Sequence, residues 1–172
     1  DVTLQNIRAF DDFDVYGHID YIIRYVPDGD RVFSYKKHAD QVDAILKLLI
    51  EKGKGIEINT GGYKAGLSEP NPCHDVLRRY KELGGEIITM GSDAHTTEYV
   101  AYRFADAKEV LKECGFRYFT VFRERKAEFL PLENSQSIFI YESSISSCSV
   151  SFAFPLSMSA ITRSRYRIFA SE

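Results

Sequence analysis

The amino-acid sequence predicts an α/β protein in which a parallel β-sheet is covered by helices. Two observations support this class. Short β-branched runs alternate with longer segments whose apolar residues recur at helical spacing, and glycines mark most of the boundaries between them. The resulting βαβα order favours a parallel sheet, either open or part of a barrel.

The first predicted elements lie in the N-terminal third of the chain. Residues 13–17 form a short β-prone run that ends at His18, and the aromatic-rich run 21–25 follows, before a Pro-Asp-Gly-Asp turn signal. Residues 36–52 are predicted to be helical because five apolar residues recur at helical spacing: Ala39, Val42, Ile45, Leu46 and Leu49. Gly53 and Gly55 mark the end of this helix.

The same alternation continues toward the C-terminus. Residues 55–60 read as a strand, and 61–72 as a loop rich in glycine and proline. A second helix is predicted from the stripe Val76, Leu77, Tyr80 and Leu83, and it is followed by a strand at 86–90. A third helix is predicted at 97–114, with Val100, Phe104, Ala107 and Leu111 on one face, and then a β-prone run at 116–122.

Composition narrows the classes of function. A chain of 172 residues can bury one core, so a single domain is expected. The net charge of -3 is too small to indicate capture of nucleic acid or anionic lipid, and no apolar run approaches the roughly 20 residues that span a bilayer. The odd number of cysteines, three, without CxxC spacing, favours reduced thiols and therefore a cytoplasmic protein.

Candidate site residues follow the predicted strands. His18, Asn59, Asp93 and His95 lie at or just beyond strand carboxyl ends, where both open sheets and barrels gather their functional loops. In extended backbone, Asp93 and His95 would project to the same side and could approach one metal ion. The alternative is that Asp93 or Thr96 caps the following helix while His95 packs nearby. For His18 the alternative is a structural role, which is the usual one for a lone histidine.

Four stretches in order resemble the histidinol-phosphatase branch of the polymerase and histidinol phosphatase (PHP) family: DFDVYGHIDYIIRY, ILKLLIEKGKGIEINTGGY, EPNPCHDVLRRYKELGGEIITMGSDAH and YFTVFRERKAEFLPL. The resemblance implies the C-terminal part of a distorted (β/α)7 barrel, a cluster of two or three divalent metals (Zn, Mn or Fe), and hydrolysis of a small phosphate monoester. By the same resemblance His18, Asp93 and His95 match metal-ligand and catalytic positions. Arg24 is suited to hold the substrate phosphate, and Asn59 to line the pocket or to orient ligands.

Part of the family pattern is not found. An N-terminal His-x-His motif would lie upstream of Asp1, so we expect residues 1–132 to be an incomplete hydrolase domain with doubtful activity alone. The open barrel edge invites association with another chain. Residues 133–172 form a serine-rich tail that we interpret as non-native or disordered, with an appended interaction segment as the alternative. Two other functions stay open, namely hydrolysis of a different phosphate ester and a non-catalytic binding role.

Overall fold

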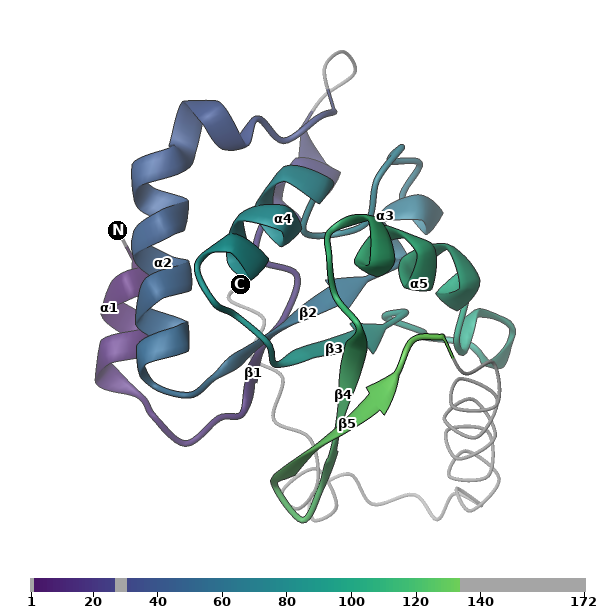
Figure 1. The fold of residues 1–172 in the computed structure, drawn as a ribbon. Coiled ribbons are helices and arrows are strands. Elements are labelled where there is room, and N and C mark those ends of the chain that lie inside the picture. The colour runs from purple at the N-terminus through teal and green to yellow at the C-terminus, as the bar shows by residue number, and fades with distance from the viewer. Residues whose placement is uncertain (1, 27–30, 134–172) are drawn as a thin grey trace, which may run out of the picture.

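A three-stranded parallel sheet forms the centre of the fold in the computed structural model, which describes residues 2–26 and 31–133 (Figure 1). The strands β1 (Val15–Tyr16), β2 (Gly55–Asn59) and β3 (Ile88–Gly91) lie side by side in the order β1-β2-β3. In the register of the sheet, Asn59 at the end of β2 is opposite Gly91 at the end of β3. The carboxyl ends of β2 and β3 therefore meet on the same side of the sheet.

Three amphipathic helices bury most of the apolar residues whose helical spacing predicted them. They are α2 (Ala39–Glu51), α4 (His74–Glu82) and α5 (Phe104–Glu113). Leu46 and Leu49 of α2, Val76 and Leu77 of α4 and Leu111 of α5 are fully buried in one core with Ile56, Ile58 and Ile88 of the sheet. The predicted helices at 36–52 and around 76–83, and the strand at 55–60, are thus confirmed within a few residues.

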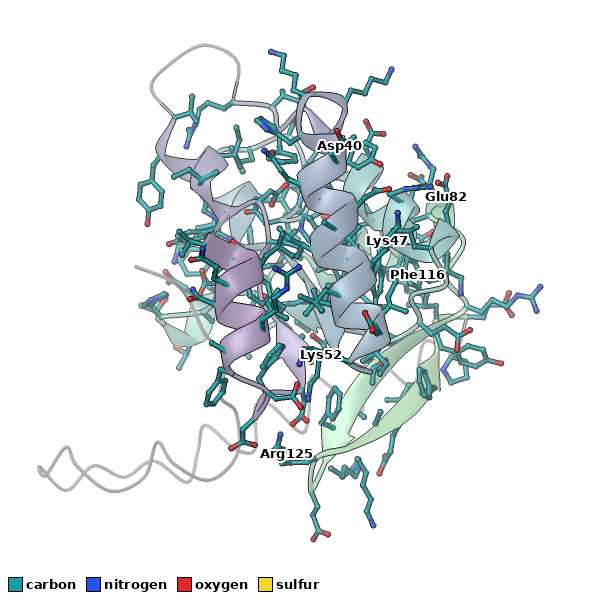
Figure 2. The ribbon with its side chains drawn as sticks, turned by 90° about the vertical axis from the view of Figure 1, so that its left-hand side faces the viewer. Asp40, Lys47, Lys52, Glu82, Phe116 and Arg125 are labelled. Atoms are coloured by element: carbon teal, nitrogen blue, oxygen red, sulfur yellow. The ribbon has the colours of Figure 1, made fainter. Side chains whose placement is uncertain are left out.

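Shorter helices connect these elements. Helix α1 (Val2–Ala9) lies beside α2 on one face of the molecule, where Asp40, Lys47 and Lys52 follow α2 along its length (Figure 2). The aromatic-rich run after β1 is a 3₁₀ helix, η1 (Tyr21–Tyr25), and a second 3₁₀ helix, η2 (Tyr35–His38), leads into α2. Inside the predicted loop 61–72 the chain forms one short helix, α3 (Gly61–Lys64).

The predicted helix at 97–114 begins later than expected. Residues Thr97–Tyr99 form a separate 3₁₀ helix, η3, and α5 starts only at Phe104. Between them Ala101 and Arg103 have positive φ angles of 57° and 55°, which interrupt a right-handed helix. Val100 accordingly lies outside the helix, whereas Phe104, Ala107 and Leu111 form its buried face as predicted.

The β-prone run at 116–122 forms a hairpin and does not extend the parallel sheet. Strand β4 (Tyr118–Arg123) pairs antiparallel with β5 (Lys126–Pro131), and the two form a separate sheet. The hairpin stays close to β3, since the Ile88 amide donates a hydrogen bond of 3.2 Å to the Thr120 hydroxyl. The prediction of a mixed α/β fold with a parallel sheet is confirmed, while the expected tail 133–172 lies almost wholly outside the described residues. Among the described residues, no helix is both long and apolar enough to cross a membrane.

Candidate active site

The Arg24 side chain lies at the centre of a polar network beyond the carboxyl ends of the strands. Its guanidinium donates from Nε to Asn71 Oδ1 at 2.8 Å, from Nη2 to Asn59 Oδ1 at 2.9 Å and from Nη1 to Asp93 Oδ2 at 2.8 Å. The side chain is only 10% exposed. The guanidinium also stacks over the Tyr21 ring, with its carbon 4.6 Å from the ring centroid.

The two asparagines lie together because their backbones pair. The Asn59 amide donates to the Asn71 carbonyl at 2.7 Å, and the Asn71 amide donates back to the Asn59 carbonyl at 2.9 Å. This isolated antiparallel bridge ties the loop after α3 to the end of β2. Side chains of such a directly opposed pair project to the same side, so both amides face one guanidinium.

A buried carboxylate orients each amide. Glu57 Oε2 accepts from Asn59 Nδ2 at 2.9 Å, and Asp20 Oδ1 accepts from Asn71 Nδ2 at 2.7 Å. The second oxygen of Asp20 accepts from the Cys73 backbone amide at 2.9 Å. Burial raises the pKa of Asp20 from its ordinary 3.8 to about 6, and the hydrogen bonds from Asn71 and Cys73 oppose that rise.

Two glycines allow the network to pack tightly. Gly61 donates its amide hydrogen to Asn59 Oδ1 at 2.8 Å, and a Cβ placed at Gly61 would lie 3.0 Å from Arg24 Nη2. A Cβ at Gly91 would overlap the Glu57 carboxylate. At both positions the backbone lies so close to the polar side chains of the network that there is no room for a Cβ atom.

The structure places the three predicted metal ligands near this network but does not gather them into one cluster. Asp93 has a left-handed φ of 52° and a side chain 32% exposed. His95 is exposed, with Nδ1 3.0 Å from the Asp93 carbonyl oxygen. His18 also has a positive φ, 26°, and its ring centroid lies 4.4 Å from that of Tyr21. Within residues 2–26 and 31–133, no three His, Cys, Asp or Glu side chains stand close enough to hold a metal ion.

These donors suit a divalent transition metal in kind but not in number. A carboxylate with imidazoles is a ligand set typical of zinc, and also of manganese or iron. One oxygen of Asp93 is already engaged by Arg24, whereas its other oxygen accepts no hydrogen bond from the residues that the structure describes. The three residues therefore fit a metal chemically and require further ligands to complete its coordination shell.

Sequence reasoning found part of this site. Asn59 and Asp93 were expected at the carboxyl ends of strands, and Arg24 was singled out through the family resemblance. The structure brings Arg24 into direct contact with both. Asp20 and Asn71 were missed. Both lie inside stretches that resemble the family, Asp20 in the one that contains His18 and Asn71 in the one that contains Asp93. Nothing in the sequence, however, marks the backbone bridge that brings Asn71 to Asn59.

Comparison with known proteins gives a consistent set of relatives. No family model matches the chain. A probable histidinol-phosphatase of Thermotoga maritima is 34% identical over 110 residues, 63% of this chain and 44% of the relative. One of Clostridium acetobutylicum is 32% identical over 70% of this chain and 46% of its own length. The histidinol-phosphatase of Lactococcus lactis is 30% identical over 78% of this chain and 48% of its own length.

A solved structure shows the same relationship in three dimensions. A crystal structure of histidinol phosphate phosphatase from Lactococcus lactis, complexed with zinc, L-histidinol and phosphate, superposes with a TM-score of 0.62. The two chains are 29% identical, and the match covers 73% of this chain and 48% of that one. The chain thus spans about half the length of the curated relatives it matches. In sequence and in fold, the chain is similar to the histidinol-phosphatases over less than half of the length of each of them.

Proposed function

We propose that the chain is part of a metal-dependent phosphatase that hydrolyses a small phosphate monoester, histidinol phosphate, to histidinol. The relatives that match most of the chain are named for this activity, and the structural neighbour is complexed with zinc, histidinol and phosphate. The observation in this chain that carries the proposal is the buried Arg24 guanidinium, which already binds an oxyanion, the Asp93 carboxylate.

Arg24 and Asn59 would form the substrate-binding part of the site. A guanidinium matches the paired oxygens of a phosphoryl group as it matches those of a carboxylate. Asn59 would contribute to phosphate binding indirectly, by positioning Arg24. Its buried amide oxygen accepts a hydrogen bond from Arg24 Nη2, and its amide nitrogen donates one to Glu57. The proposed contact to phosphate is therefore made by the Arg24 edge that faces Asp93.

His18, Asp93 and His95 would hold the divalent metal, zinc, manganese or iron, at the same end of the sheet. A bound ion at this place would polarise phosphoryl oxygens and make a bound water acidic enough to act near neutral pH. The complete site is proposed to contain two or three ions, with the remaining ligands supplied by the part of the homologues that this chain does not match. The positive φ at His18 and Asp93 turns each side chain away from its strand direction, as functional residues often require.

The larger architecture that this function implies is a distorted (β/α)7 barrel, with residues 1–132 as its C-terminal part and 133–172 as a separate tail. The crystal structure of the relative is about twice as long as the matched region, which supports this view. In a complete barrel the outer edge of β1 would pair with a further strand, from another segment or another chain. We place the protein in the cytoplasm, consistent with the free, buried thiols of Cys73 and Cys114.

The first test is the metal content of the purified chain, measured by elemental analysis on the parent and on Asp93→Ala and His95→Ala. Metal that is bound in stoichiometric amount by the parent and lost in both variants supports the proposed ligands. His38→Ala is the matched control, because His38 packs on the Phe33 ring and belongs to no part of the network. Release of phosphate from histidinol phosphate then tests the substrate. Equal metal content in all four proteins would contradict the assignment.

A further inference from the structure

The Arg24 guanidinium donates hydrogen bonds to two neutral amides, those of Asn59 and Asn71. Each amide is in turn oriented by a buried carboxylate. We propose that Asn71, oriented by Asp20, is a positioning residue that acts with Asn59 to hold Arg24 with only its Nη1 edge open to an oxyanion of the phosphate class. The inference deepens the proposed function and rests on its assignment of Arg24 as the phosphate-binding residue.

The direction of each amide follows from its carboxylate partner. The ionised form of Asp20 can only accept, so the Asn71 group facing its Oδ1 must be the NH₂ group. The Asn71 oxygen is then turned toward Arg24 Nε. Glu57 fixes the Asn59 amide in the same manner. A reversed Asn71 amide would place NH₂ against the Nε hydrogen and lose both hydrogen bonds.

Burial determines which edge of the guanidinium an anion can reach. Asn71 is fully buried at 0% exposure, and Asn59 and Asp20 are each 2% exposed. The Nε and Nη2 edges are therefore closed by protein. The Asp93 side chain, which accepts from Nη1, is 32% exposed, so it is the one of these three described partners that borders solvent.

The charge of the partners explains what the open edge can bind. Asn71 accepts a hydrogen bond from Nε and Asn59 accepts one from Nη2, and neither amide brings a negative charge onto the guanidinium. Of the three described residues that accept hydrogen bonds from the guanidinium, only Asp93 is charged. A second oxyanion that approached Nη1 would compete with the Asp93 carboxylate for the same donor, and a phosphate brings more charge and more oxygens to that competition.

The experiment is a titration of the full chain with inorganic phosphate, in the presence of a chelator, by isothermal calorimetry. The proteins are the parent, Arg24→Lys, Asn71→Ala and the double variant. We expect each single variant to weaken phosphate binding by about tenfold, the factor that loss of one charge-assisted hydrogen bond gives. Lysine has no Nε donor, so Asn71→Ala should cause no further loss when Arg24 is already lysine.

Two isosteric variants sharpen the test. Asp20→Asn keeps the shape but presents an NH₂ group that favours the reversed Asn71 amide, so it should also weaken phosphate binding. Asp93→Asn removes the competing carboxylate and should strengthen it. Ser68→Ala is the control, because Ser68 lines the same small pocket as Asp20 and Asn71 but is not one of the residues that hold the Arg24 guanidinium. If Asn71→Ala fails to fold, judged by circular dichroism, Asp20→Asn carries the same prediction.

Two results would overturn the positioning role. One is a loss of phosphate affinity on Asn71→Ala that is equally large in the parent and in Arg24→Lys. Such a loss would show that Asn71 acts on the structure in general and not through Arg24. The other is absence of phosphate binding by the parent, or binding insensitive to Arg24→Lys. If phosphate binds as expected but histidinol phosphate is not hydrolysed by the metal-loaded chain after it is joined to the part of the homologues that it does not match, the proposed function fails while the positioning role stands.

Discussion

Gly61 lies where any side chain would press on the site. Its backbone amide donates to Asn59 Oδ1, and an added Cβ would come within 2.8 Å of that oxygen and 3.1 Å of the Asp93 Cβ. Because Asn59 is buried and tied to Glu57 and Arg24, it has little room to move aside. Gly61 is therefore a packing requirement of the network.

We expect Gly61→Ala to lower the free energy of unfolding by about 1–3 kcal/mol, through overpacking, and to weaken phosphate binding by displacing Arg24. Urea denaturation and the phosphate titration measure the two effects. Gly53→Ala is the control, since Gly53 has a φ of 65° and no atom near an added Cβ. That variant should cost about 1 kcal/mol from backbone strain and leave phosphate affinity unchanged. An unaltered phosphate affinity in Gly61→Ala would contradict the expectation.

The buried carboxyl of Asp20 makes stability depend on pH. Its pKa is about 6 in the folded protein against an ordinary 3.8, so the folded state retains the proton over that interval while the unfolded state releases it. The contribution of Asp20 to stability is fully present below pH 3.8 and is lost as pH rises to about 6. At 1.36 kcal/mol per pH unit over about two units, the loss amounts to about 3 kcal/mol.

The measurement is the difference in free energy of unfolding between the parent and Asp20→Asn from pH 4 to pH 7, by urea denaturation. We expect the parent to lose stability relative to the variant as pH rises. Comparing the two proteins at each pH cancels the titration of other groups. A difference that stays constant across this range would show that Asp20 titrates normally.

At the scale of elements, one ion pair joins α2 to α4. Arg79 of α4 donates to both oxygens of Asp43 on α2, at 3.0 Å from Nε and 2.6 Å from Nη2, and the Tyr35 hydroxyl adds a third hydrogen bond at 2.8 Å. The hydrogen bond from Arg79 is the largest cause that holds the pKa of Asp43 below its ordinary 3.8. The pair links two helices that also meet in the core.

We expect Asp43→Asn to lower the urea midpoint at neutral pH, because the variant loses a charge-assisted bidentate contact. The sign of the pH effect follows from the lowered pKa. The stability from Asp43 is present above pH 3.8 and is lost as pH falls below it, so parent and variant should converge in acid. Asp75→Asn is the control, since its exposed contact with Arg78 within α4 should contribute little.

The elements themselves show what the sequence can and cannot specify. Helices α2 and α4 were predicted because their buried stripes repeat at 3.6 residues, and that periodicity reflects packing against the sheet. The β4–β5 hairpin was missed for a local reason. Its turn residues Glu124 and Arg125 have positive φ angles of 49° and 64°, a conformation usually signalled by Asn-Gly or Asp-Gly.

At the site, the sequence predicted the residues that follow strands and missed those brought in by a loop. Asp93 and Asn59 could be found because the ends of parallel strands converge. Asn71 joins them only through its backbone bridge to Asn59, and Asp20 only through Asn71. Contacts of this kind depend on the path of a loop, which residue periodicity does not describe.

At the scale of the whole molecule, Arg125 connects the C-terminal hairpin to the segment that enters β1. Its guanidinium pairs with Asp12 and with both oxygens of Asp14, more than a hundred residues earlier in the chain. In Figure 2, Arg125 lies at the tip of the hairpin beyond the end of α2 that carries Lys52. All three side chains are partly exposed, so salt should weaken this connection.

We expect Arg125→Ala to increase hydrogen exchange of the β4–β5 amides while leaving α2 unchanged, because the hairpin loses its tie to the β1 segment. Hydrogen exchange followed by mass spectrometry makes the comparison. Raising the salt concentration should produce the same change in the parent and little in the variant. Arg123→Ala is the control, since in the described part of the chain Arg123 pairs across the hairpin with Glu128 and not with the β1 segment. Exchange that is equal in all three proteins would contradict the role of Arg125.

The strands of the central sheet lie in the order in which they occur along the chain. Each new strand therefore joins an edge that the preceding strand has just formed, and no strand has to wait for a later one to be inserted between its neighbours. Such an order keeps the sequence separation of contacting residues low, which favours rapid folding. A chain built in this way can assemble its sheet from one end as it leaves the ribosome, adding one strand and its helix at a time.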